Sequence, residues 1–158
     1  MARQFTLLLI FISLCAFPAF ATDKSTCDGK MVVNGKSTNL THVYALANQT
    51  YMHVIFSDLP LSDENLATFP DSLLKEINAG KLHAIRLGID DQGAADSTDV
   101  FDAAGWTTIK EESKLELKTI DAKNVAGRLH LAKPYVDYGG TKVDYDIKFS
   151  VPVRSEWW

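Results

Sequence analysis

The side chains best suited to metal binding or proton transfer are the four histidines, His42, His53, His83 and His130. His42 and His53 lie in two apolar segments on either side of Asn48-Gln49. If these segments pair across that turn, both imidazoles fall on one face, diagonal to each other. Asp58 or His83 could complete a site, so the candidate metal ligands are His42, His53 and Asp58. The alternative is that they are hydrogen-bonded packing residues, because no H-E-x-x-H or C-x-x-C spacing occurs.

No pattern typical of catalysis or of a cofactor site occurs in the chain. The G-x-S-x-G spacing of nucleophilic enzymes is absent. The Asp-rich stretch 90–102 offers oxygen ligands for calcium, but it does not match a calcium-binding loop and is equally typical of a solvated loop. We therefore expect no catalytic residues and no cofactor. The alternative is a small metal-dependent or hydrolytic enzyme that uses His42, His53 and Asp58.

Aromatic residues near the C-terminus are the candidate partner-binding residues. Tyr135 and Tyr138 lie beside Gly139-Gly140, and the sequence ends in Trp157-Trp158. Tyrosine and tryptophan are the residue types that most often anchor a protein interface. The alternative is that each of them folds back to cover the end of the core.

The first 21 residues have the pattern of a cleaved secretory signal peptide. Arg3 is followed by an apolar run over 5–17, and Ala19-Phe20-Ala21 supplies a small-x-small exit. The run is shorter than the roughly 20 residues that span a bilayer, and the residue before Cys15 is not the small residue that a lipid-attachment signal requires. The sequence predicts a periplasmic or secreted protein, with residues 22–158 as a single domain and no transmembrane segment after cleavage.

Charge and cysteine content narrow the classes of partner. Removal of residues 1–21 takes away one Arg and no acid, so residues 22–158 carry 15 Lys and Arg against 20 Asp and Glu, a net charge of −5. A nucleic-acid partner would require a basic face, so a protein or a small ligand is expected.

After removal of residues 1–21, Cys27 is the only cysteine left, and it is buried, reactive or paired between chains. Asn39 and Asn48 begin glycosylation sequons, which matter only in a eukaryotic secretory route.

Strand periodicity dominates the C-terminal half. Apolar residues alternate with polar ones from Val143 to Val153, which places them on one face of a strand. The segment 123–133 alternates similarly, so we expect 123–133 and 141–153 to form a hairpin. Pro152 cannot donate to a ladder, which predicts that the last strand ends there or lies at an edge. Leu115 and Leu117 indicate one more strand before this hairpin.

The N-terminal half contains strands and one helical segment. Asn34-Gly35 predicts a tight turn between strands 30–33 and 36–46, and residues 22–29 look like a flexible lead-in. Apolar runs around Asn48-Gln49 and over 82–89 predict three further buried strands. From 62 to 80 the apolar spacing is three and four, which is helical, with Ser62 as the cap and Gly80 as the stop. Residues 90–102 are expected to form a loop with a short strand near Val100.

These patterns predict a mainly β domain, an antiparallel sandwich or barrel of about seven to nine strands with one helical insertion over 62–80. The function they favour is that of an exported, non-catalytic binding protein, such as an inhibitor or an immunity-type module.

Overall fold

The computed structural model describes residues 24–47 and 51–154. The predicted signal peptide over 1–21, the turn at Asn48-Gln49 and the candidate residues Trp157 and Trp158 lie outside the described residues.

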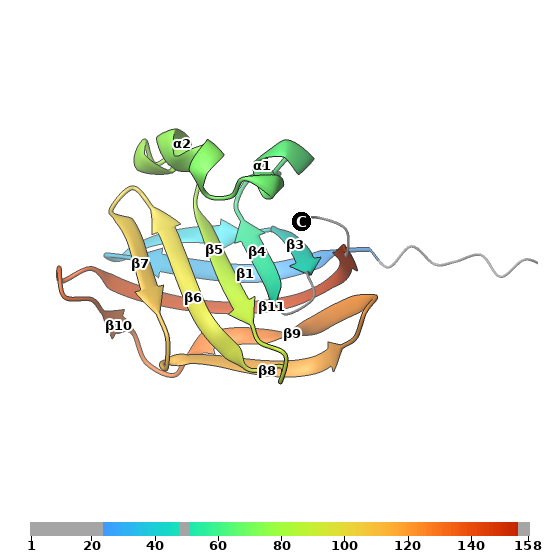
Figure 1. Ribbon diagram of the computed structural model, residues 1–158. Helices are drawn as coiled ribbons and strands as arrows, with labels where there is room; N and C mark the ends of the chain where they lie inside the picture. The colour runs from blue at the N-terminus through green and yellow to red at the C-terminus, as the bar shows by residue number, and fades with distance from the viewer. Residues whose placement is uncertain (1–23, 48–50, 155–158) are drawn as a thin grey trace, which may run out of the picture.

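The described chain forms two β-sheets that pack face to face and share one strand (Figure 1). Sheet A has the order β2-β1-β11-β9-β8, and sheet B has the order β3-β4-β5-β6-β7. The strands of sheet A are β1 (Thr26–Val33), β2 (Lys36–Leu40), β8 (Ser113–Ile120), β9 (Asn124–Leu131), β10 (Tyr135–Val136) and β11 (Lys142–Arg154). Those of sheet B are β3 (His42–Ala47), β4 (Met52–Ser57), β5 (Ala84–Ile89), β6 (Ala95–Asp102) and β7 (Gly105–Ile109). The mainly β fold is confirmed, as a sandwich and not a closed barrel, but the described residues form eleven strands instead of seven to nine, and β11 pairs with β3 in parallel.

Strand β11 joins the two sheets. It pairs with β1 and β9 in sheet A, and its last residues, Val153 and Arg154, pair in parallel with β3 of sheet B. The strand runs through Pro152, so it does not end there, but Pro152 pairs on one side only, as the alternative of an edge position predicts. The Val153 N–H donates to the Lys123 carbonyl on the side of β9. Because successive backbone nitrogens of a strand point to opposite sides, the nitrogen of Pro152 points away from β9. The β1 ladder ends at Ser150 on that side, so the proline costs no ladder hydrogen bond.

The main core fills the space between the sheets. The predicted alternation holds in β9 and β11, where the apolar residues from Val125 to Leu131 and from Val143 to Val151 are buried. Phe149 of sheet A meets Phe56 of sheet B edge to face, with ring centroids 5.1 Å apart. The predicted hairpin of 123–133 with 141–153 is therefore confirmed, and its buried face forms half of this core.

The N-terminal hairpin is also confirmed. Asn34 and Gly35 both have positive φ, as a two-residue turn requires, and Val33 pairs with Lys36. Strand β1 begins at Thr26, so the second half of segment 22–29, which was expected to be a flexible lead-in, belongs to a strand. The predicted strand 36–46 is two strands, because the chain leaves sheet A at Thr41, whose N–H donates to the Ser57 carbonyl in sheet B.

A helical segment covers part of the outer face of sheet B (Figure 1). It consists of α1 (Asp63–Ala67), the 3-10 turn η1 (Asp71–Leu73) and α2 (Leu74–Asn78). The Ser62 hydroxyl accepts the Asn65 N–H at 3.2 Å, and Gly80 closes the segment with positive φ. Both predictions are confirmed. Within the described residues, no helix is long and apolar enough to cross a membrane.

Most of the predicted loop over 90–102 forms a strand, which includes and extends the short strand that was expected near Val100. Strand β6 begins at Ala95, and β7 follows after a two-residue turn that the sequence analysis did not predict. Only 90–94 forms a turn, in which the Asp90 carboxylate accepts the N–H groups of Gln92 and Ala94.

The helical segment generates a stability prediction. Ile77 is buried, whereas Leu74, which belongs to the same predicted stripe, is 39% exposed. Ile77→Ala should lower the free energy of unfolding by about 2–5 kcal/mol, because it leaves a cavity against sheet B. Leu74→Ala should change it by less than about 1 kcal/mol. Urea unfolding measures both, and equal losses would contradict the placement of this segment.

Candidate functional site

The predicted histidine pair is not brought together. In the β3–β4 ladder, His42 faces Ser57 and His53 faces Leu46, so the two imidazoles share a face but lie four residues apart. At about 3.3 Å per residue this is roughly 13 Å, and the expectation of diagonal neighbours is wrong. Across the described parts of the chain, no three His, Cys, Asp or Glu side chains are grouped as metal ligands.

Asp58 is paired with His83 instead. Its carboxylate accepts the His83 backbone N–H at 2.9 Å and lies 2.8 Å from the ring Nδ1. The Asp58 N–H in turn donates to the His83 carbonyl at 3.2 Å. These contacts tie the end of β4 to the start of β5, beside the helical segment, and they give Asp58 a structural role.

A buried carboxylate organises the half of the sheet B outer face that the helices leave open. Arg86, Asp99 and Thr108 lie opposite one another on β5, β6 and β7. Asp99 is only 6% exposed. One carboxylate oxygen accepts hydrogen bonds from Nε and Nη2 of Arg86, at 3.1 and 2.7 Å. The other accepts hydrogen bonds from the Thr108 hydroxyl at 2.7 Å and from the Trp106 indole N–H at 3.0 Å. Four hydrogen bonds compensate the burial of this charge.

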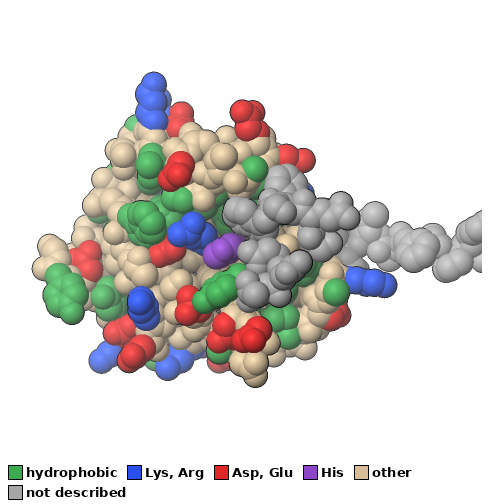
Figure 2. Space-filling model, viewed as in Figure 1, with side chains coloured by type: hydrophobic (Ala, Val, Ile, Leu, Met, Phe, Trp, Pro, Cys, Tyr) green, Lys and Arg blue, Asp and Glu red, His purple; other side chains and the backbone are tan. Residues whose placement is uncertain are grey.

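The same network fixes Trp106. The Arg86 guanidinium carbon lies 5.8 Å from the centre of the Trp106 ring and 5.7 Å from that of Phe101, within cation–π range. The Phe101 and Trp106 rings are 5.3 Å apart. Trp106 nevertheless exposes 57% of its surface. On this face of the molecule, Figure 2 shows basic, acidic, histidine and hydrophobic side chains gathered beneath the helices. A large aromatic ring held rigidly at the surface is suited to binding a partner.

His53 borders this network. Burial lowers the pKa of its imidazole, and the positive charge of Arg86 lowers it further, against the opposing effect of Asp99. The ring is therefore neutral near pH 7. The Tyr51 ring stacks on it with centroids 6.1 Å apart. His53 contributes a neutral polar surface beside Arg86, away from Asp58.

The predicted tyrosines lie at the edge of the sandwich beside β7. Tyr138 is fully exposed, so the alternative that it covers the core is wrong, whereas Tyr135 is half-buried against the core. The Thr107 hydroxyl of β7 donates to Asp137 at 3.2 Å, which holds the turn after β10 against β7. Trp106, Val136 and Tyr138, all exposed, thus lie at one end of the molecule, and we name them the aromatic edge.

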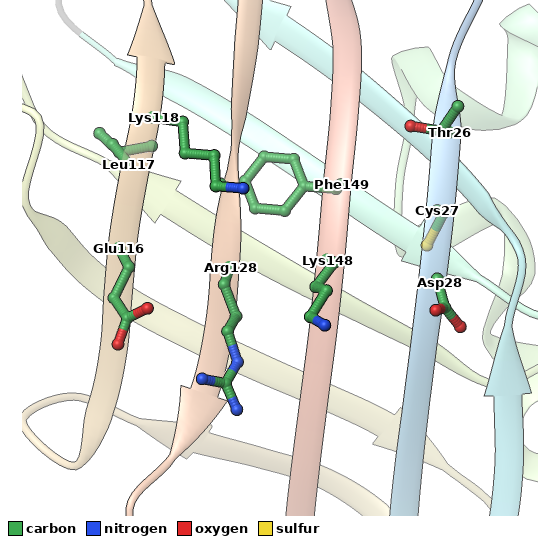
Figure 3. Close-up of a pocket in the computed structure, with 10 residues that line it drawn as sticks. Thr26, Cys27, Asp28, Glu116, Leu117, Lys118, Arg128, Lys148 and Phe149 are labelled. Carbon is green, nitrogen blue, oxygen red and sulfur yellow. The ribbon is translucent and has the colours of Figure 1, made fainter.

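The outer face of sheet A offers a groove of about 530 Å³ between charged side chains (Figure 3). Glu116, Arg128, Lys148 and Asp28 form one cross-strand row in which acids flank two bases. Arg128 also makes two hydrogen bonds to Asp146, at 2.8 and 2.7 Å. Opposite charges compensate one another across these strands, which is typical of a solvated sheet face.

Cys27 lines this groove from β1. Its thiol donates to the Leu40 carbonyl at 3.2 Å. Burial, with a smaller contribution from Asp28, raises the pKa of this thiol to about 12, so it is neutral at physiological pH. Pairing of Cys27 between chains stays a prediction.

Comparison with known families, curated proteins and solved structures found no match to this chain. Sequence reasoning named Tyr138 but missed Arg86, Asp99 and Trp106. A Trp followed by two Thr and an Ile was a signal for a strand with an exposed aromatic residue.

The Asp99 network predicts a large loss of stability on substitution. Asp99→Ala leaves the Arg86 charge without its partner in a mostly buried position, so the free energy of unfolding should fall by about 3 kcal/mol. Asp146→Ala removes the partner of an exposed Arg on neighbouring strands and should cost several-fold less. Urea unfolding of the two variants tests this contrast. Similar losses would show that Asp99 is not the support of the site.

The high pKa of Cys27 predicts that its thiol reacts slowly with disulfide reagents. In the full chain carrying Cys15→Ser, Cys27 should react with a disulfide reagent at about pH 8 at least a hundredfold more slowly than in guanidinium, because only the thiolate attacks. Reaction rates followed by absorbance measure this. Equal native and unfolded rates would contradict the burial of the thiol.

Proposed function

We propose that this chain is an exported, non-catalytic binding protein that takes a protein partner on the aromatic edge. The observation that carries the proposal is Trp106, which exposes 57% of its surface while its indole N–H is bonded to Asp99. A rigid aromatic side chain loses little conformational entropy on binding, so its contact area contributes almost fully to affinity. Val136 and Tyr138 add exposed apolar surface at the same end of the molecule.

A binding role fits the chemistry of this region better than the alternative enzyme. His42 and His53 are separated along the ladder, and Asp58 is engaged with His83. The oxygens of Asp99 are committed to four hydrogen bonds, which leaves this carboxylate poorly placed to move a proton. An inhibitor or immunity-type module is the form of binding protein that we favour.

The proposal includes export to the periplasm or the medium, with cleavage after Ala21. Expression of the full chain in a secreting host should yield an exported product whose N-terminal sequence begins at Thr22, because the 19–21 pattern directs the peptidase there. A product that keeps Met1 and stays inside the cell would contradict export.

The aromatic edge predicts which substitutions abolish binding. A partner captured from the exported fraction of the source organism, then purified, should bind Trp106→Ala and Tyr138→Ala at least about tenfold more weakly than the unaltered chain. Leu59→Ala is the matched control, because Leu59 is an exposed apolar residue at 50% but follows β4 at the helical end. Titration calorimetry gives the dissociation constants. Unchanged affinity in both edge variants would contradict the proposal.

A further inference from the structure

Strand β7 forms a free edge of sheet B. Among the described residues its backbone pairs with β6 alone (Figure 1). Asp102 and Gly105 close a two-residue turn, so they form a hydrogen-bonded pair. Alternation along the ladder then turns the backbone N–H and C=O of Trp106 and Thr108 away from β6. These groups are placed to receive another strand.

Strand β7 lacks the protective features of the edge strands β8, β2 and β10, and the turn at Asp137 contacts it through the Thr107 side chain. Strand β8 carries Lys114, Glu116 and Lys118 and has a bulge between Leu117 and Thr119. Strand β2 begins with a lysine, and β10 has only two residues. Proteins use charges, bulges and short strands to keep edges from pairing. Strand β7 has the sequence GWTTI, with no charge, no proline and a regular register.

The surroundings of β7 indicate what could pair with it. Its centre is uncharged and rich in β-branched residues, whereas Asp102 lies at one end, and Lys110, Glu111 and Glu112, with a net charge of −1, follow the other. Asp137 lies beside Thr107, and hydrogen bonds led by the Thr141 N–H hold the pKa of its carboxyl below the usual value, so it is ionised. Basic groups at the ends of an added strand would complement these acids.

We infer that the free edge of β7 binds an extended segment of the partner protein, with an uncharged β-branched centre and basic ends, by strand addition. The inference rests on the proposed function and names the partner's mode of binding. Trp106 would pack on the side chains of the added strand, while the backbone groups of Trp106 and Thr108 form its ladder.

A second copy of this chain is a poorer occupant. Two β7 edges side by side would join five residues from each chain, plus the few exposed residues of the aromatic edge. Stable dimers use about 20–30 residues a side. Two copies would also bring the acidic flanks of β7 together, which a basic segment would neutralise.

The direct test uses the full chain and a defined peptide, acetyl-KSTVTVTSK-amide. With this peptide at millimolar concentration, hydrogen exchange at the amides of Trp106 and Thr108 should slow at least about tenfold, because these N–H groups become bonded. The amides of Thr107 and Ile109, already bonded to β6, should change less. Two control peptides, one with proline at the central threonine and one with glutamates in place of the lysines, should bind at least about tenfold more weakly.

Two variants at one position provide the matched control. Thr108→Pro removes the outward N–H, whereas Thr108→Val keeps it, and both lose the hydroxyl contact with Asp99. Thr108→Pro should weaken peptide binding at least about tenfold relative to Thr108→Val. The urea midpoints of both variants show whether they fold, and the control peptides test the inference on the unaltered chain if the proline variant does not.

Three results would overturn the inference. One is the absence of any saturable change at Trp106 and Thr108 with the first peptide. Another is equal binding of the proline-containing peptide. The third is protection of these amides from exchange without any peptide, if that protection increases with the concentration of the chain. Such a result would show that a second copy occupies the edge. If the captured partner still depends on Trp106, the proposed function survives such a failure. If the peptide binds but no partner depends on Trp106, the proposed function fails and the edge site stands.

Discussion

The buried carboxylate of Asp99 is the interaction on which the open half of sheet B depends. It sits on β6 and accepts hydrogen bonds from β5 on one side and from β7 on the other. Burial of this charge is tolerable because Arg86 neutralises it and all its bonds are local to three neighbouring strands. The same contacts orient the indole of Trp106. A structural requirement, compensation of a buried charge, thus produces a fixed aromatic surface beside a free strand edge.

The remainder of the fold leaves this edge available. Strand β11 binds the two sheets to each other, and the helical segment buries the other half of the sheet B outer face. On sheet A, rows of opposite charges compensate one another, and the Arg128–Asp146 pair lies in the open. Such pairs add little stability in water but keep a sheet face solvated. The molecule therefore presents one protected, charged face and one face with an unprotected edge.

The sequence predicted those elements whose signals are local. Alternation identified β9 and β11 and their buried faces, and Asn34-Gly35 identified a hairpin, because each pattern reports directly on one strand or turn. Only the part of strand β6 near Val100 was predicted, because Asp99 reads as a solvated loop residue until Arg86, thirteen positions away, is seen opposite it. Tyr138 was named from residue type alone, whereas the role of Trp106 depends on contacts across three strands. Pairing of Asp58 with His83 was missed for the same reason.

Trp106 is rigid before any partner binds. The nitrogen relaxation order parameter of its indole N–H in the free chain measures this rigidity directly. The hydrogen bond to Asp99 and the stacking on Arg86 predict a value near 0.85, about that of rigid backbone. A value below about 0.6 would show a mobile ring and contradict the rigidity of Trp106.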